Sequence, residues 1–238
     1  MKFLTTAITV YLLTNSLMIL SGSAQAPSPT QIKFEMVVTG KSPYPLADRK
    51  DLSLNTGGGK GILISPRWAM TASHCITWRK QKAGKVTINF PGPKGKKITV
   101  KVTKVLRHKS KDIALLQLAR AVKPEERVPV LLLREKVLGK FPMKKCSGNA
   151  AWRDIPAVGK NDNFAVPNKK DRKGIAGTSG SPWLMHSKTV GDVLIGVTHG
   201  SGRAPSVAWV SRWIQETVNK NGGAKLVWAT ANQARGKK

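Results

Sequence analysis

The stretch Gly61-Ile-Leu-Ile-Ser-Pro-Arg-Trp-Ala-Met-Thr-Ala-Ser-His-Cys75 decides the fold expected for this chain. Its apolar first half is typical of a buried strand, and it leads into a turn of small residues that ends at His74. A lone histidine after a strand is more often structural than catalytic, so its role depends on what the rest of the chain provides.

Short strands recur along the sequence. Residues 86–90 and 98–103 alternate apolar and polar side chains with the period of two that a half-buried strand requires. More continuous apolar runs predict buried strands at residues 113–118, 128–133, 193–197 and 207–210. One helix is expected, at about residues 211–219. Many short strands separated by Gly and Pro turns predict an all-β chain of the sandwich or barrel class.

The charge of the chain is extreme. Lys and Arg number 41 against 12 Asp and Glu, which gives a net charge of +29 over 238 residues. This balance excludes an ordinary neutral enzyme surface and predicts salt-sensitive attraction to anionic surfaces or polyanions. No reading-helix motif is present and aromatic residues make up only 6%, so sequence-specific nucleic-acid binding is not expected. No metal-ligand spacing occurs either, so we predict no metal and no cofactor.

The first residues have the pattern of a secretory signal peptide. Lys2 supplies a short positive start, an apolar stretch follows to Leu20, and small residues end the segment. We predict cleavage after Ala24, with Ala26 as the alternative, and a secreted or periplasmic protein. Cleavage removes one lysine and no acid, so the mature charge is 29 − 1, or +28.

Two further segments complete a set of catalytic side chains. Lys111-Asp-Ile-Ala-Leu-Leu-Gln-Leu118 places one acid at the start of an apolar strand, and Gly174-Ile-Ala-Gly-Thr-Ser-Gly-Ser-Pro182 is a glycine-rich turn around Ser179. A serine hydroxyl needs a base to take its proton, imidazole can accept and return that proton, and a buried carboxylate orients the imidazole. The order His74, Asp112, Ser179 in an exported all-β chain therefore points to nucleophilic catalysis.

These motifs resemble the chymotrypsin-like (trypsin-fold) serine peptidases. The resemblance covers about residues 37–220 and rests on Thr71-Ala-Ser-His-Cys75, Asp112-Ile-Ala-Leu-Leu116, Gly177-Thr-Ser-Gly-Ser-Pro182 and Thr198-His-Gly200. Within this family, the compact bacterial branch that includes glutamyl endopeptidases is the most similar. That branch has a small polar residue before the serine and Ser-Pro after the glycine that follows the serine, as this chain does. The resemblance implies two antiparallel six-stranded β-barrels with a C-terminal helix, and a monomeric endopeptidase that acts on proteins or peptides.

The resemblance also implies the division of the chain. It predicts an N-terminal extension or propeptide at residues 25–36, a first barrel at 37–122, a second barrel with the helix at 123–220, and a basic tail at 221–238. His74, Asp112 and Ser179 form the triad, and the backbone N–H groups of Gly177 and Ser179 form the oxyanion hole.

Substrate selection is implied by position in the same way. Lys173, six residues before Ser179, would form the pocket floor, with a wall of Thr198, His199 and Gly200 and with Ser206 further along. A buried lysine needs an acidic partner, which a substrate Glu or Asp could supply. Acidic preference is thus predicted, with small apolar or broad preference as the alternative.

The two cysteines give the last expectation. Cys75 and Cys146 are the only cysteines of an exported chain, and we predict that they form a disulfide; two free thiols are the alternative. A different class of function also remains open: an inactive protease-fold protein that binds polyanions through its basic surface.

Overall fold

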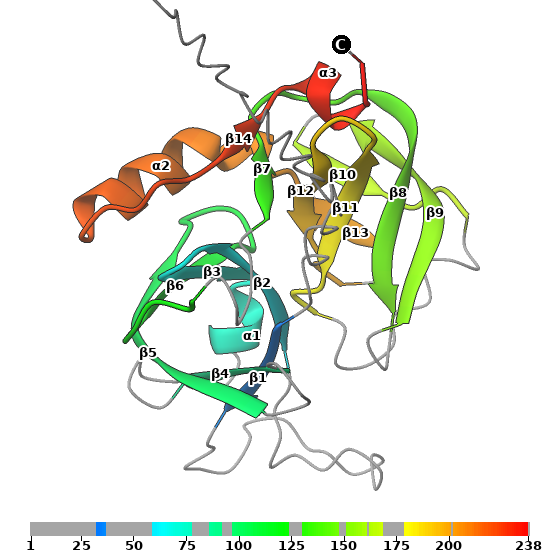
Figure 1. Ribbon diagram of the computed structural model, residues 1–238. Coiled ribbons are helices and arrows are strands. Elements are labelled where there is room, and N and C mark those ends of the chain that lie inside the picture. Colours follow the sequence, from blue (N-terminus) through cyan, green and yellow to red (C-terminus); the bar gives the residue numbers. More distant parts are fainter. Residues whose placement is uncertain are drawn as a thin grey trace, which may run out of the picture.

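The computed structural model describes residues 32–36, 59–77, 86–91, 97–123, 130–147, 151–160, 162–168, 179–200 and 202–237. Its strands build two sheets, with a helix lying across the boundary between them (Figure 1). The predicted class, all-β with two barrel-like halves and a C-terminal helix, is confirmed. None of the helices in these ranges is long and apolar enough to cross a membrane.

The first sheet is a closed barrel with the strand order β1-β2-β3-β6-β5-β4. Its strands are β1 (Ile32–Met36), β2 (Lys60–Ser65), β3 (Trp68–Thr71), β4 (Val86–Pro91), β5 (Lys97–Arg107) and β6 (Ala114–Leu118). The predicted alternation holds: Val86, Ile88, Val100 and Val102 are buried in the barrel interior, while Lys101 between the last two is exposed.

Strand β1 closes this barrel. It pairs with β4 through Phe34↔Ile88 and its neighbours, and with β2 through Ile32↔Gly61. It lies inside the segment 25–36 that the sequence analysis set apart as an extension. Removal of the whole segment would take away a barrel strand and leave β2 and β4 with open edges.

The second sheet has the order β13-β10-β9-β8-β11-β12-β7-β14. Its strands are β7 (Leu131–Leu133), β8 (Gly139–Ser147), β9 (Ala151–Lys160), β10 (Asn163–Ala165), β11 (Pro182–Ser187), β12 (Gly191–Val197), β13 (Arg203–Pro205) and β14 (Trp228–Ala229). An antiparallel bridge between Gly196 and Ser206 brings the end of β12 to the residue after β13, so six strands curl into a ring. Strands β7 and β14 extend the sheet by parallel pairing, which the six-strand expectation did not include.

One apolar cluster joins the two sheets. It contains Ile62, Trp68 and Leu115 from the first barrel and Leu132 and Leu194 from the second. Helix α2 (Ser211–Lys220) adds its buried face to the same cluster through Ile214 and Val218. Figure 1 shows this helix lying over the first barrel although it stands in the chain between β13 and β14 of the second sheet. Burial of these side chains in one cluster fixes how the two halves meet.

The end of α2 is tied to the first barrel by polar contacts. Lys104 Nζ donates to Asn221 Oδ1 at 3.1 Å, and Gln117 Nε2 donates to the Asn221 carbonyl oxygen at 2.6 Å. Lys104 lies on β5 and Gln117 on β6, more than 100 residues before Asn221. The helix therefore links the first barrel to the second sheet.

Two local expectations differ from the structure. Residues 207–210 were predicted to be a strand, but Ala208–Val210 form a 3-10 helix, η4, in which Val210 N–H donates to Val207 C=O. A short apolar run fits a buried helical turn as well as a strand, so the periodicity could not separate them. Residues 221–238, expected to be a basic tail, include β14 and a capped helix, α3 (Ala231–Ala234), packed on the second sheet.

Candidate active site

His74 and Asp112 lie together at one end of the first barrel. His74 begins helix α1 (His74–Thr77) just after β3, and Asp112 precedes β6. Because β3 and β6 pair with Thr71 opposite Ala114, their adjoining loops lie side by side. His74 N–H donates to Asp112 Oδ1 at 2.7 Å, and its ring Nδ1 lies 2.5 Å from Oδ2. The expected contact between His74 and Asp112 is present.

The turn that carries Asp112 is held by His108. The backbone N–H groups of Ser110 and Lys111 both donate to His108 Nδ1, at 3.2 and 3.0 Å. The His108 ring stacks edge-on against Trp213 of α2, with 5.0 Å between ring centroids. The position of the acid therefore depends on a contact with the C-terminal helix as well as on the barrel.

The protonation states of the pair follow from these contacts. The hydrogen bond with Asp112 raises the pKa of His74 above its ordinary 6.5; a contact with Cys75 acts in the same direction, and burial opposes both. Burial alone would raise the pKa of Asp112, but hydrogen bonds from His74 and His199 outweigh it and lower the pKa to about 2. Asp112 is therefore ionised and stabilises the imidazolium form of His74.

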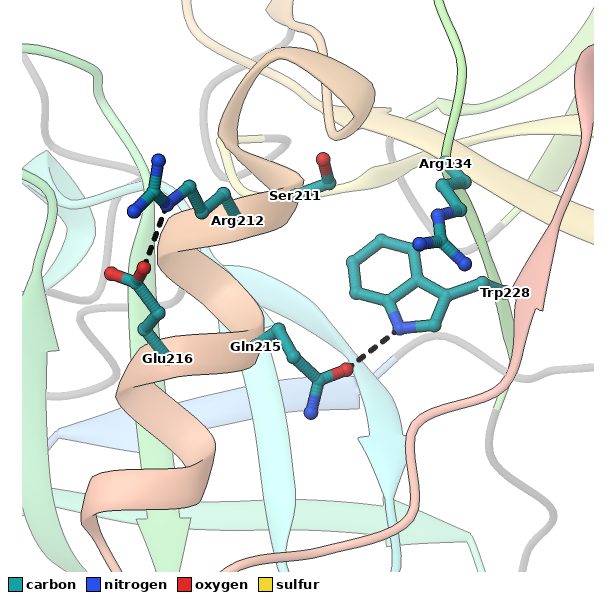
Figure 2. A pocket seen from close by; sticks show the side chains of 6 residues that line it. All are labelled: Arg134, Ser211, Arg212, Gln215, Glu216 and Trp228. Carbon is teal, nitrogen blue, oxygen red and sulfur yellow. Dashed lines mark hydrogen bonds and ion pairs between the residues drawn. The ribbon is translucent and has the colours of Figure 1, made fainter.

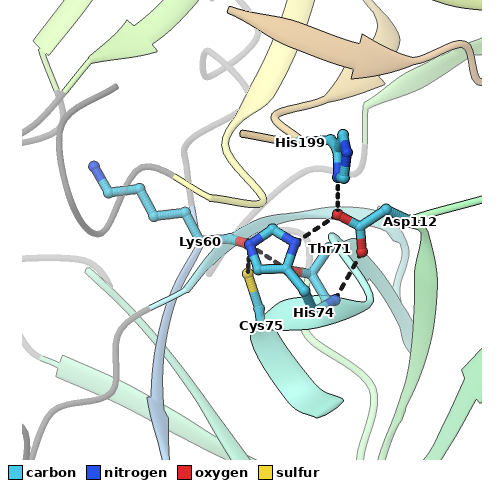
Figure 3. A network of polar contacts seen from close by, with 6 residues as sticks. All are labelled: Lys60, Thr71, His74, Cys75, Asp112 and His199. Atoms are coloured by element: carbon cyan, nitrogen blue, oxygen red, sulfur yellow. Dashed lines mark hydrogen bonds and ion pairs between the residues drawn. The ribbon is translucent and has the colours of Figure 1, made fainter. Parts of the chain in front are cut away.

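His199 is the third side chain of this cluster. It follows β12 in the second sheet, and its Nδ1 also contacts Oδ2 of Asp112, as Figure 3 shows. The His74 and His199 rings lie edge to face with their centroids 6.0 Å apart. His199 was expected in the wall of a substrate pocket; in the structure its ring nitrogen is directed at the acid instead.

The three side chains have the residue types that bind metal ions, and each offers a ligand atom within 4.8 Å of the others. However, Nδ1 of His74 is 2.5 Å from the carboxylate oxygen. Two ligands of one zinc ion, each about 2.1 Å from it, would be about 3.3 Å apart. The spacing is that of a hydrogen-bonded cluster, and His74, Asp112 and His199 are best described as one.

Ser179 is brought to this end of the barrel by its backbone. Its carbonyl accepts the N–H of Lys60, the first residue of β2, at 2.7 Å. Lys60 C=O in turn accepts the hydroxyl of Thr71 at 2.6 Å, and Thr71 lies three residues before His74. In the part of the chain that the structure describes, no hydrogen bond joins Ser179 Oγ to His74. The structure thus places the described end of the serine loop, Ser179 and Gly180, next to the start of β2. It does not form the serine–histidine bond.

Gly180 allows the backbone after Ser179 to lie very close to Lys60 and Thr71. Its φ is +78°, and a Cβ at this position would lie 2.0 Å from Lys60 O and 2.4 Å from Thr71 Oγ1. Its N–H donates to Thr198 C=O at 2.9 Å. Only glycine combines this left-handed backbone with such close contact to the strand edge.

The remaining predicted site residues have varied surroundings. Gly177 and Lys173 lie outside the described residues. Thr198 is buried, and its Oγ1 donates to Ser181 C=O while accepting Trp183 Nε1–H, so its side chain is used inside the sheet. Ser206 is buried, whereas Gly200 is exposed with φ +58°.

The predicted disulfide is not formed. Cys75 carries a free, buried thiol, and its Sγ lies 3.9 Å from Nε2 of His74 (Figure 3). The thiol is thus directed at the imidazole rather than at another sulfur, in line with the free-thiol alternative. The side chain of Cys146, on β8, is outside the described part.

A cavity of about 320 Å³ lies away from these residues. It opens between α2, β14 and the chain after β7, and is lined by Arg134, Ser211, Arg212, Gln215, Glu216 and Trp228 (Figure 2). Gln215 accepts the indole N–H of Trp228 at 2.9 Å. None of the predicted pocket residues lines it.

An ion pair between the sheets was not foreseen from the sequence. Lys111, beside Asp112, pairs with Asp162, whose carbonyl accepts the N–H of Ser206 in the second sheet. Lys111 is one of 41 basic residues, so nothing in the sequence singled it out. The same holds for the contact of His199 with the acid, because both depend on how the two sheets meet.

Comparison with known proteins finds similarity to one family over part of the chain. The profile of the family described as Trypsin matches residues 37–146, which is 110 of 238 residues and includes both His74 and Asp112. The chain is similar to the trypsin family. It is also 28% identical to human granzyme M over 115 residues, covering 42% of this chain and 43% of granzyme M. The match therefore spans less than half of that relative, and the trypsin-family match ends before Ser179.

Proposed function

We propose that this protein is a serine endopeptidase that hydrolyses peptide bonds through an acyl-enzyme, with Ser179 as nucleophile. The observation that carries the proposal is the convergence of two arrangements at one end of the barrel. His74 and Asp112 are hydrogen-bonded there, and the Ser179 backbone is bound to Lys60, on the strand that pairs with the histidine segment. Similarity to the trypsin family supports the same reaction class.

The proton path follows from the hydrogen bonds. An ionised carboxylate only accepts, so Nδ1 of His74 carries a proton and Nε2 is the basic nitrogen. Ser179 Oγ transfers its proton to Nε2 as it attacks the scissile carbonyl carbon, and the imidazolium then protonates the leaving amine. Water repeats the sequence on the ester, which returns the proton to Ser179 and releases the acid product.

The oxyanion in this scheme is bound by the backbone N–H groups of Gly177 and Ser179. The positive φ of Gly180 gives the turn after Ser179 the sharp reversal such a loop needs. Movement of the Ser179 side chain toward Nε2 completes the triad, because catalytic hydrogen bonds are often long before substrate binds.

Covalent labelling tests this proposal. The mature protein treated with a fluorophosphonate should gain one adduct on Ser179, and Ser179→Ala should gain none. Ser181→Ala is the matched control, because Ser181 lies two residues away and is 0% exposed. A wild-type protein that stays unlabelled while folded and soluble would favour the alternative, an inactive fold that binds polyanions.

For substrate preference we propose cleavage after acidic residues, as in the glutamyl-endopeptidase-like branch. The mature charge of +28 favours acidic over basic peptides near the cleft, and Lys173 supplies a cation at the position that forms the pocket floor in such folds. Peptide-library profiling should find Glu or Asp enriched before the scissile bond. Cleavage dominated by Lys or Arg there would contradict it.

Export and surface adhesion complete the proposal. Residues 1–24 have the pattern of a signal peptide, and exposed basic residues of β5, such as Lys101, Lys104 and Arg107, add to a surface that attracts anions. N-terminal sequencing of the exported protein tests the cut, and the salt needed to elute it from an anionic resin tests the adhesion.

A further inference from the structure

We propose that His199 is a positioning residue that holds Asp112 from the second sheet and thereby sets the basicity of His74. The inference rests on the proposed peptidase function. It differs from the role in the pocket wall that the sequence suggested, because the ring nitrogen of His199 is directed at the carboxylate.

The geometry of Asp112 shows what His199 contributes. Oδ1 accepts the backbone N–H of His74, and Oδ2 faces Nδ1 of both His74 and His199. Among the described residues, the other side-chain or backbone donor to these two oxygens is His74 of the first barrel, the residue that the acid must orient. His199 supplies an independent donor from the end of β12, so the carboxylate is held between the two sheets.

The path from His199 to the second sheet is short and rigid. Thr198, directly before it, is 2% exposed and is hydrogen-bonded to Ser181 and Trp183. The backbone N–H of His199 donates to Arg203 C=O at 2.8 Å. The His199 side chain itself is 54% exposed, so it is held by its backbone and by Asp112 rather than by packing. The backbone of His199 is therefore fixed to the second sheet, and its side chain can hold Asp112 in position.

The electrostatic consequence has a definite sign. Each donor on the carboxylate takes up part of its negative charge, so the His199 donor leaves less of that charge to stabilise the His74 imidazolium. Loss of His199 should therefore raise the pKa of His74. Among the described residues, the other titratable groups near the pair are Cys75 against His74, and His108 and Lys111 in the acid's turn, where Lys111 is paired with Asp162.

The kinetics of His199→Ala distinguish a residue that positions Asp112 from one that lines the substrate pocket. As a positioning residue, His199 should lower kcat when removed, by about 10- to 100-fold, the loss expected for one charge-assisted hydrogen bond. The acid limb of the kcat/KM profile should also move to higher pH, since the free enzyme must then reach a higher pH before His74 is neutral. A wall residue would raise KM and leave kcat and the acid limb in place.

Two further variants sharpen the test. His199→Asn keeps a side-chain N–H near the position of Nδ1 and should restore most of kcat and the original acid limb. His186→Ala is the matched control, because His186 is 58% exposed and its Nδ1 lies 2.8 Å from Asp192 Oδ1. This is the same kind of pair, at the turn end of the β11–β12 hairpin, the end away from His199. It should leave kcat, KM and the acid limb unchanged.

A readout without substrate distinguishes failure of this inference from failure of the proposed function. NMR titration of the His74 ring should give a higher midpoint in His199→Ala than in the wild type, with His199→Asn close to the wild type. An unchanged midpoint overturns the positioning role even if the protein is a peptidase. If His199→Ala does not fold, the Asn variant decides: a wild-type midpoint and kcat support the role, and a change in KM alone overturns it.

Discussion

Replacing Ser179 or His74 by alanine should each lower kcat by about 10⁵–10⁶, and replacing both should cost little more. The reason is that in the proposed mechanism the two side chains act on one proton. Without the imidazole the hydroxyl is a weak nucleophile, and without the hydroxyl the imidazole has no proton to take. Initial rates on a peptide substrate, measured for both single variants and the double variant, check the magnitude and the non-additivity.

Ser181→Ala is the control for this experiment. Ser181 lies in the same segment, is 0% exposed, and its hydroxyl has no hydrogen-bond partner among the described residues. Its removal should leave the rate within a few-fold of wild type. If Ser179→Ala kept near-wild-type activity, or if Ser181→Ala lost as much as Ser179→Ala, the assignment of the nucleophile would be wrong.

Gly180→Ala should destabilise the protein by at least about 3 kcal/mol and sharply reduce hydrolysis. The new Cβ would lie 2.0 Å from the backbone oxygen of Lys60, which cannot move without disturbing the start of β2. Strain of the left-handed backbone adds to the clash. Displacement of the serine loop by about 1 Å would by itself cost about 10²-fold in rate. Denaturant unfolding and peptide hydrolysis measure the two effects.

Gly191→Ala separates the clash from the backbone strain. Gly191 has nearly the same φ, +79° against +78°, but nothing lies within 4 Å of its Cβ position. Gly191→Ala should therefore lower the free energy of unfolding only by the backbone strain, about 1–2 kcal/mol. Equal losses of stability for the two variants would show that the serine loop does not pack against β2 as described.

The parts of the site and fold that could be predicted are those recorded by residues close together in the sequence. Asp112 could be chosen over the six other acids between His74 and Ser179 because none of those begins a comparable apolar strand. The structure pairs Asp112 with His74. The barrel strands at residues 86–90 and 98–103 were predicted from their own alternation of side chains, which records burial of one face. The 3-10 helix at Ala208–Val210 was missed because an apolar run of that length has no distinctive period.

The disulfide was predicted from composition and compartment, and neither specifies where two side chains point. In the folded chain Cys75 Sγ lies 3.9 Å from Nε2 of His74, so its sulfur lies beside the imidazole. A pairing rule based on counting cysteines cannot anticipate that orientation, because it is set by the first turn of α1.

The sequence alone determined the all-β class, the C-terminal helix, and the histidine and acid that meet at one end of the first barrel, because alternation, apolar runs and turn residues are recorded locally. Only the tertiary structure decided that β1 closes the barrel, that β7 and β14 extend the second sheet, and that His199 and Asp162 reach the loop of Asp112. These contacts join residues 50 to 96 positions apart, or depend on how two curved sheets pack through one apolar cluster. No periodicity in a single chain records that packing.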